Sequence, residues 1–258
     1  MKSLPQNQER NKIIAVTAGD PAGIGCEVAL KAFNYILKES SAILVFIVRK
    51  SVLQHYPHLE IDFIQINSDY DPNSLLPECI YLLDVELPYD IPVVGCGNAS
   101  TGAESLAYID KAIELWLKGK IDAIVTGPVS KALINLNGIN FKGHTEYFAE
   151  KTDDLIPYMM MFSPNYRVIL STTHVPLQDV APLLDEEKIL NVIRIADKSL
   201  RMIDKTEPKI AVAGLDPHCG DDGAIGNFDV ITRNAVLKAR KEGIQAEGPF
   251  AADSIFRA

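Results

Sequence analysis

Apolar residues in this chain form short unbroken runs, which alternate with longer stretches where they recur every three or four positions. Such runs occupy residues 13–17, 42–48, 79–83 and 121–125. Short, nearly continuous apolar runs are typical of strands that are covered on both faces, as in parallel sheets. We therefore expect strands at these four places.

Helical periodicity follows or separates these runs at about residues 26–38, 190–203 and 231–241, and most clearly between Thr101 and Gly119. Thr101-Gly-Ala-Glu104 fits a capping box, in which the hydroxyl and the carboxylate each satisfy a free amide at the helix start. Four large residues at helical spacing predict one buried stripe on this helix. They are Leu106, Ile109, Ile113 and Trp116.

The alternation of strands and helices predicts an α/β protein with a mainly parallel sheet and helices on both of its faces. Residues 51–77 are rich in polar residues and proline, and we interpret them as a crossing between two lobes. The sequence shows no internal repeat and no low-complexity linker.

Composition narrows the class of protein. The 258 residues are 47% hydrophobic and 23% charged, as in ordinary globular proteins. The net charge of −9 argues against a nucleic-acid or anionic-membrane partner, but it does not exclude an anionic substrate. The four cysteines form no CxxC pair, which disfavours a zinc ribbon. The N-terminus lacks the apolar core of a signal peptide, and no apolar run could cross a bilayer, so we expect a cytoplasmic protein.

Two of the five histidines lie just past apolar runs of strand type. His174 follows a run that begins at Arg167, and His218 follows one that begins at Lys209. Functional side chains gather beyond the carboxyl ends of parallel strands, and neutral imidazole binds divalent ions. A catalytic metal usually needs at least three protein ligands, and no third is evident. Asp216 and Asp221 are candidates for further ligands or for groups that orient the imidazoles.

Three other segments have residues suited to anions. Gly19-Asp-Pro-Ala-Gly-Ile-Gly25 fits either a tight turn or an anion site at a helix start, but it matches neither the dinucleotide fingerprint nor a P-loop. Thr126-Gly-Pro-Val-Ser-Lys131 offers a Ser/Lys pair for an anion or a proton transfer, or a helix cap at Ser130. Phe141-Lys-Gly-His144-Thr145 offers donors for a phosphate, or a structural His-Thr pair.

In their order along the chain, these segments resemble the 4-hydroxythreonine-4-phosphate dehydrogenase family of pyridoxal phosphate biosynthesis. Gly248-Pro-Phe-Ala-Ala-Asp253 also resembles the family's Gly-Pro…Asp element. The five matching segments span most of the chain. They are Gly19-Asp-Pro-Ala-Gly-Ile-Gly25, Thr126-Gly-Pro-Val-Ser-Lys131, Gly143-His-Thr-Glu146, Thr172-Thr-His174-Val-Pro-Leu177 and Gly214-Leu-Asp-Pro-His218-Cys-Gly220.

The resemblance implies a metal-dependent oxidation of 4-phosphohydroxy-L-threonine by NAD or NADP. The β-keto acid that forms then decarboxylates to 3-amino-2-oxopropyl phosphate. It implies a divalent metal (Zn, Mg or Co) held by three histidines, of which His174 and His218 are two. His144 and Thr145 fall on residues that contact the substrate. Catalytic and cofactor-binding residues stay unassigned.

The resemblance also implies a fold like that of the isocitrate and isopropylmalate dehydrogenases. On that basis residues 1–258 form one α/β unit of two interleaved lobes around a mainly parallel sheet, with the active-site cleft between the lobes. It further implies a homodimer whose active site is shared between subunits, with a phosphorylated small molecule as substrate.

The chain departs from the family pattern in three respects. Asp216 and Cys219 replace the family's usual Asn and frequent Ala, and no His-Asp-Gln-Gly motif with a third histidine ligand is present. We therefore expect the chain to end before the family's C-terminal segment and to show little or no turnover. Two alternatives stay open: a 4-phospho-threonate or 4-phospho-erythronate dehydrogenase, and a truncated, non-catalytic member that binds a ligand.

Overall fold

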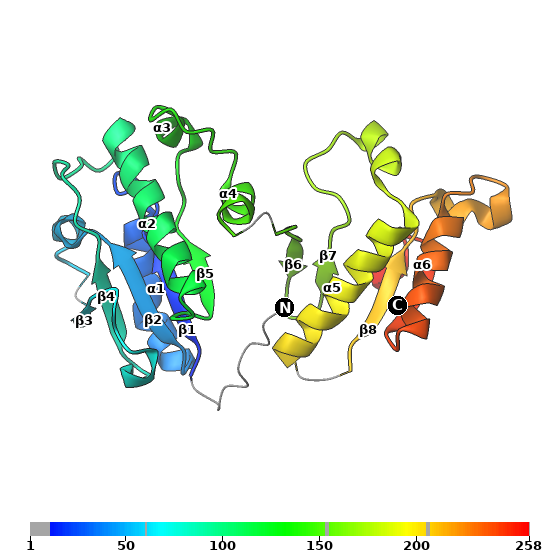
Figure 1. Cartoon of the computed structure of the whole chain (residues 1–258), viewed down its shortest axis with the longest axis horizontal. Coiled ribbons are helices and arrows are strands. Elements are labelled where there is room, and N and C mark those ends of the chain that lie inside the picture. Colours follow the sequence, from blue (N-terminus) through cyan, green and yellow to red (C-terminus); the bar gives the residue numbers. More distant parts are fainter. Residues whose placement is uncertain (1–10, 60, 153–154, 205–206, 258) are drawn as a thin grey trace. The chain divides into compact units, whose positions relative to one another are not determined.

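The computed structural model describes residues 11–59, 61–152, 155–204 and 207–257. The chain forms two compact units, Met1–Leu155 and Ile156–Ala258 (Figure 1). Residues 51–77 lie inside the first unit, so the boundary between units is not where the sequence placed a crossing. The interleaving of lobes stays a prediction. Within the described residues, no helix has the length and apolar character that a bilayer crossing requires.

The first unit is built on a five-stranded parallel sheet with the order β3-β4-β2-β1-β5. β2 is buried at every position, as its unbroken apolar run predicts. The strands are β1 (Ile13–Thr17), β2 (Ile43–Val48), β3 (Phe63–Ile66), β4 (Ile80–Asp84) and β5 (Ala123–Thr126). The helices are α1 (Gly25–Glu39), α2 (Ala99–Leu117), α3 (Lys131–Asn135) and α4 (His144–Lys151), with short 3-10 turns η1 (Lys50–His55) and η2 (Pro72–Ser74).

Helix α2 begins differently from the sequence prediction. Asn98 is its N-cap: the Asn98 side chain accepts a hydrogen bond from the Thr101 amide (3.1 Å), and the Thr101 hydroxyl accepts one from the Asn98 amide (3.0 Å). The predicted box at Thr101-Gly-Ala-Glu104 is therefore wrong, because Glu104 lies inside the helix and is buried. The predicted buried stripe is confirmed except at Trp116, which is 40% exposed.

Glu104 instead forms a buried ion pair with Arg49, just after β2. The guanidinium donates from Nε to Glu104 Oε1 and from Nη2 to Oε2, each at 2.9 Å. The Tyr108 hydroxyl also donates to Glu104, and it accepts a hydrogen bond from the Arg49 amide (3.0 Å). The guanidinium further donates to the carbonyls of Tyr89 (2.5 Å) and Asp90 (3.0 Å). The pair thus joins β2, α2 and the loop before α2.

The second unit contains two small sheets. β6 (Met160–Phe162) and β7 (Arg167–Ile169) are antiparallel, whereas β8 (Lys209–Ala213) and β9 (Gln245–Phe250) are parallel. The helices are α5 (Glu186–Asp204) and α6 (Asp229–Lys241), with 3-10 turns η3 (Leu177–Asp179), η4 (Ala181–Leu183), η5 (Pro217–Gly223) and η6 (Ile255–Arg257). Both helices pack on the β8–β9 sheet in one apolar cluster, which confirms the two helices that periodicity predicted.

We predict that Glu104→Gln lowers the free energy of unfolding of the first unit by about 3–5 kcal/mol, because it leaves a buried guanidinium without its counter-charge. Denaturation followed by the fluorescence of Trp116, the single tryptophan of the chain, measures this loss. Glu114→Gln is the matched control on α2, since its partners Lys111 and Lys118 are surface groups. It should cost no more than ~1 kcal/mol. Equal losses in both variants would contradict the structural role of the Arg49 pair.

Candidate anion and metal sites

Two of the sequence motifs meet at the carboxyl edge of the five-stranded sheet. The chain passes from β1 to β2 on one side, whereas β5 pairs with β1 on the other, so the strand order reverses between β1 and β5. Ligands of open α/β sheets bind at such a switch point. Here the Asp20 amide donates to the Pro128 carbonyl (2.9 Å), and the Gly127 amide donates to the Thr17 carbonyl (2.9 Å). The loops after β1 and β5 therefore lie side by side.

These loops approach each other so closely that several positions must be glycine. A Cβ on Gly19 would lie 2.3 Å from the Pro128 carbonyl oxygen, and Gly19 has a φ of +74°. A Cβ on Gly25 would lie 2.2 Å, and one on Gly127 2.6 Å, from the Ala18 carbonyl oxygen. These separations are shorter than a van der Waals contact permits. The tight-turn interpretation of the Gly19–Gly25 loop is therefore confirmed.

Lys131 follows β5 in the chain, and its side chain lies close to the start of α4. Ser130 accepts a long hydrogen bond from the Leu133 amide (3.4 Å), which confirms the helix-cap interpretation of this serine. A Cβ built on Gly143, the residue before α4, would lie 3.5 Å from Lys131 Nζ. Within the described part of the chain, no carboxylate forms an ion pair with this ammonium group.

His144 and Thr145 are the first two residues of α4. The His144 ring packs edge-on against Phe141 (centroids 5.7 Å apart) and lies 6.2 Å from the ring of Phe148. Its Nε2 is buried and has no hydrogen-bond partner among the described residues. Because nearly all buried polar atoms in proteins are paired, this nitrogen is suited to bind a ligand. Thr145 is exposed beside it.

The electrostatics at the start of α4 favour a neutral imidazole and a bound anion. Burial lowers the pKa of His144, and the nearby charge of Lys131 lowers it further. The amides at the start of the helix and the Lys131 ammonium both attract negative charge. Glu146 opposes them, since a Cβ on Gly143 would lie 2.8 Å from Glu146 Oε2. The structure therefore brings His144, Thr145 and Lys131 together as one candidate site.

In the second unit, both predicted metal ligands have left-handed backbone conformations. The φ angles are +56° at His174 and +52° at His218, and both side chains are exposed. At His218 the left-handed conformation continues to Gly223. Each non-glycine residue in this region costs about 1–2 kcal/mol, and such strain concentrates at functional sites. The surrounding structure must therefore hold these loops in place.

Asp229 fixes the loop that carries His218. This carboxylate, at the first position of α6, is 2% exposed and accepts hydrogen bonds from the amides of Leu215 (3.0 Å) and Asp216 (2.9 Å) and from the hydroxyl of Thr232 (2.9 Å). Asp216 in turn accepts from the Phe228 amide (2.9 Å). Asp216 thus helps to close the loop, and its predicted role beside an imidazole stays a prediction. The sequence interpretation missed Asp229, although an acid in the first turn of a predicted helix was a usable signal.

The imidazole rings of His174 and His218 are suited to form part of a metal site. Neither imidazole has a hydrogen-bond partner among the described residues, so both ring nitrogens are available to an ion. Two neutral imidazoles suit Zn²⁺ or Co²⁺ well and Mg²⁺ less well, because Mg²⁺ prefers oxygen ligands. In the portions of the chain that the structure describes, no cluster of three His, Cys, Asp or Glu side chains is present. The metal role of His174 and His218 therefore stays a prediction.

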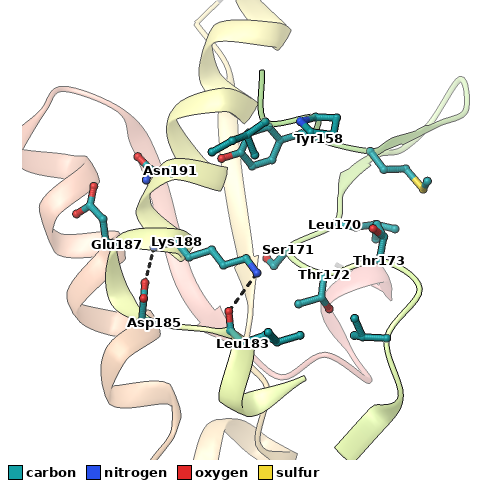
Figure 2. A pocket seen from close by; sticks show the side chains of 14 residues that line it. Tyr158, Leu170, Ser171, Thr172, Thr173, Leu183, Asp185, Glu187, Lys188 and Asn191 are labelled. Carbon is teal, nitrogen blue, oxygen red and sulfur yellow. Dashed lines mark hydrogen bonds between the residues drawn. The ribbon is translucent and has the colours of Figure 1, made fainter. Parts of the chain in front are cut away.

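A pocket of about 510 Å³ lies beside the loop of His174 (Figure 2). Polar groups from this loop, Ser171 and Thr172, line it together with Tyr158 and with Asn191 of α5. Lys188 also lines it, and its ammonium donates to the Leu183 carbonyl (3.1 Å). The carboxylates of Asp185 and Glu187 line it too, so the pocket combines neutral hydrogen-bonding groups with charges of both signs next to a candidate metal ligand.

Comparison with known proteins gives a consistent result. Residues 39–258 match the family model described as "Pyridoxal phosphate biosynthetic protein PdxA". The chain is 33% identical to a 4-hydroxythreonine-4-phosphate dehydrogenase of Sulfurihydrogenibium sp., over 94% of this chain and 75% of that protein. It is 34% identical to a "Putative D-threonate 4-phosphate dehydrogenase" of Symbiobacterium thermophilum, over 95% of this chain and 74% of that protein.

Solved structures agree with these sequence relatives. The crystal structure of the 4-hydroxythreonine-4-phosphate dehydrogenase from Klebsiella pneumoniae superposes with a TM-score of 0.83 at 31% identity, covering 96% of this chain and 77% of that one. The likeness confirms the predicted α/β fold class, with the isocitrate and isopropylmalate dehydrogenase-like fold. The chain spans about three quarters of the length of the proteins that it matches.

We predict that Lys131→Met raises the pKa of His144, because it removes a positive charge that disfavours the imidazolium. Burial keeps that pKa below the ordinary value of 6.5 even in the variant. An NMR titration of the His144 ring measures the change. Lys142→Met is the matched control, since Lys142 is an exposed neighbour that does not contribute to the shift. A larger effect of Lys142→Met would show that the charge of Lys131 does not act on the ring.

The same shift gives a pH dependence of stability. On acidification the unfolded chain takes up the His144 proton before the folded chain does, so this residue contributes stability above pH 6.5. That contribution is lost as the pH falls through the lowered folded-state pKa.

Proposed function

Because this chain belongs to the PdxA family of pyridoxal phosphate biosynthetic proteins, we propose that it oxidises 4-phosphohydroxy-L-threonine with NAD or NADP. The β-keto acid product then loses CO₂ to give 3-amino-2-oxopropyl phosphate. The names of the relatives support a dehydrogenase of the pyridoxal phosphate pathway. The observation that carries the substrate assignment is the start of α4, where a buried imidazole nitrogen without a partner among the described residues lies close to the Lys131 ammonium group.

In this proposal the start of α4 binds the phosphorylated substrate. The Lys131 ammonium, the Thr145 hydroxyl and the free amides of the helix start hydrogen-bond to anionic oxygens of the substrate. His144 stays neutral because of its burial and of Lys131, and its Nε2 forms a hydrogen bond with a polar group of the substrate. These contacts orient the substrate, and an exact orientation is a large part of the barrier reduction in any dehydrogenase.

His174 and His218 are the proposed metal ligands of this chain. When bound, a divalent ion such as Zn²⁺, Co²⁺ or Mg²⁺ would stabilise negative charge on the substrate's alcohol oxygen. The chain's own contribution is to hold the imidazoles in position. Asp229 and Asp216 fix the loop of His218 by hydrogen bonds to its backbone, so the strained conformation at His218 is maintained.

A second substrate is supported by one relative. The Symbiobacterium thermophilum protein bears the name of a D-threonate 4-phosphate dehydrogenase, and it is as similar to this chain as the other relatives are. That substrate also carries a phosphate, so the site at α4 suits both compounds. They differ in the amino group, which no described residue of the site singles out.

We also propose a cytoplasmic homodimer with a shared active site, on the basis of the family resemblance.

We predict that the chain binds 4-phosphohydroxy-L-threonine more tightly than its dephosphorylated form, measured by calorimetry. Lys131→Met should lower the affinity by about tenfold or more, because a charge-assisted hydrogen bond contributes ~1.5–3 kcal/mol. Lys142→Met is the control and should bind normally. Equal affinity for the two forms would contradict a phosphate site at α4.

Reduction of NAD or NADP with each phosphorylated compound then tests the reaction. Turnover of 4-phospho-D-threonate, with none of 4-phosphohydroxy-L-threonine, would overturn the substrate assignment. Binding of the phosphorylated compounds without any turnover would favour the ligand-binding alternative.

We further predict that Co²⁺ shifts and broadens the NMR signals of His174 and His218 before those of His55 and His58. His174→Ala and His218→Ala should each weaken Co²⁺ binding by about tenfold or more, because even the loss of a group that only orients a ligand typically costs about 10–100-fold. His58→Ala, a change at a surface loop, is the control. Unchanged Co²⁺ affinity in both ligand variants would refute their role, whatever the activity of the protein.

A further inference from the structure

Helix α4 cannot fix its own position. It has eight residues, and its N-cap, Gly143, has no side chain that could cap the helix start. Helices this short are marginal in water, so their position depends on contacts with the rest of the protein. Among residues 144–151, all of which the structure describes, Tyr147 is the only buried one, at 7% exposure. The contacts that hold α4 therefore act mainly through Tyr147.

The Tyr147 hydroxyl joins α4 to α2. It donates to Asp110 Oδ1 (2.6 Å), and Asp110 lies on the exposed face of α2. Burial and this carboxylate both raise the pKa of Tyr147, so the phenol keeps the proton that it donates. Lys151, one turn further along α4, lies over the same ring, with Nζ 5.3 Å from the centroid. A hydrogen bond between two defined atoms fixes the place of α4 along α2, whereas apolar contact has no preferred direction.

The ring of Tyr147 also contacts the surroundings of His144. Its centroid lies 5.4 Å from that of Phe141, and the Phe141 ring packs edge-on against His144 (5.7 Å). The Tyr147 amide donates to the Gly143 carbonyl (3.0 Å). His144 and Tyr147 are three positions apart, so they lie on the same face of α4. A displacement of Tyr147 would therefore move both the imidazole and the helix start.

The part of the site that contains Lys131 is also attached to α2. A Cβ on Gly102 of α2 would lie 2.3 Å from the Leu133 carbonyl oxygen, so α3 and α2 are in close contact. The Asn137 side chain, just after α3, donates to the Ala99 carbonyl of α2 (2.9 Å). Helix α2 is in turn held to the end of β2 by its buried ion pair. One helix therefore supports both halves of the candidate site.

We propose that Tyr147 and Asp110 are positioning residues for the phosphorylated substrate. Their hydrogen bond keeps the start of α4, with His144 and Thr145, at the separation from Lys131 that lets one anion contact both sides. Neither residue touches the substrate: Asp110 acts through Tyr147, and Tyr147 acts through α4. This role rests on the proposed function, because it requires that the start of α4 binds that substrate.

Calorimetry with 4-phosphohydroxy-L-threonine tests this role. Tyr147→Phe removes the hydroxyl and keeps the buried ring, so it should lower the affinity by about three- to tenfold, as the loss of one hydrogen bond does. Tyr70→Phe is the matched control. Tyr70 is 8% exposed, its hydroxyl donates to the Lys120 carbonyl (3.0 Å), and Lys120 Nζ lies 5.2 Å from its ring centroid. Lys120 precedes β5, whereas the candidate site lies beyond the carboxyl end of that strand, so Tyr70→Phe should bind normally.

Two changes at Asp110 separate the hydrogen bond from the charge. Asp110→Asn keeps an acceptor oxygen and should retain most of the affinity, whereas Asp110→Leu should lower it as far as Tyr147→Phe does. Because the two residues act through one bond, the double variant of Asp110→Leu and Tyr147→Phe should bind no more weakly than Tyr147→Phe alone. Additive losses in the double variant would show that the two side chains act separately, and this would contradict the positioning role.

The ring of His144 reports the position of α4 without any substrate. Its pKa is lowered by burial and by Lys131. Tyr147→Phe should raise that pKa toward its ordinary value, because a displaced helix start admits water to the imidazole. Tyr70→Phe should leave the NMR titration of His144 unchanged. Unfolding followed by the fluorescence of Trp116 verifies that both variants are folded.

The positioning role is overturned if Tyr147→Phe binds the phosphorylated compound normally, if it leaves the His144 titration unchanged, or if Tyr70→Phe lowers the affinity equally. Equal affinity of the unmodified protein for the phosphorylated and dephosphorylated compounds would refute the proposed function, and the positioning role with it. A shifted His144 titration in Tyr147→Phe would in that case show a purely structural link between α4 and α2.

Discussion

The first unit depends on how closely the backbone after β1 approaches the backbone after β5. Only glycine permits it, since a side chain at Gly19 or Gly127 would overlap the opposite loop. This contact fixes the segment that ends at Ser130, from which α3 begins and Lys131 projects. Helices α2 and α3 approach each other just as closely, since a Cβ on Gly102 of α2 would lie 2.3 Å from the Leu133 carbonyl oxygen of α3. The position of the Lys131 ammonium is thus set by backbone packing.

Different physical effects determine the environment of the candidate histidines in the two units. At His144 the cause is burial: aromatic rings surround the imidazole, its pKa is lowered, and one nitrogen has no partner among the described residues. At His218 the cause is backbone strain, which the buried carboxylate of Asp229 maintains through hydrogen bonds to neighbouring amides. A buried neutral imidazole is suited to an oriented hydrogen bond with a substrate. An exposed imidazole on a stiff loop is suited to an ion, which needs a ligand that moves little.

The sequence predicted the elements whose residues are determined locally. The run at β2, the periodicity of α1 and α5, and the motifs after β1 and β5 all occur in the structure as expected. It failed where a distant residue decides. Glu104 looked like a capping residue, but Arg49, 55 positions earlier, draws it into the interior. α4 was not predicted, since its eight residues have little apolar periodicity and Gly143 offers no capping side chain. The unpaired nitrogen of His144 could not be inferred from spacing.

The exposed residues of β8 show a further limit of prediction from the hydrophobic pattern. Its residues read as a buried strand, yet Lys209, Ala211 and Ala213 are exposed, while Ile210 and Val212 are half-buried. The hydrophobic pattern indicates which side chains are buried. It does not indicate which strand edges are paired, because every residue except proline carries the same peptide groups. A short, small-residue strand such as β8 is stable in the middle of a sheet and poorly covered at its margin. Within the part of the chain that the structure describes, β8 pairs with β9 alone, so its apolar run could not indicate how few of its neighbours are strands.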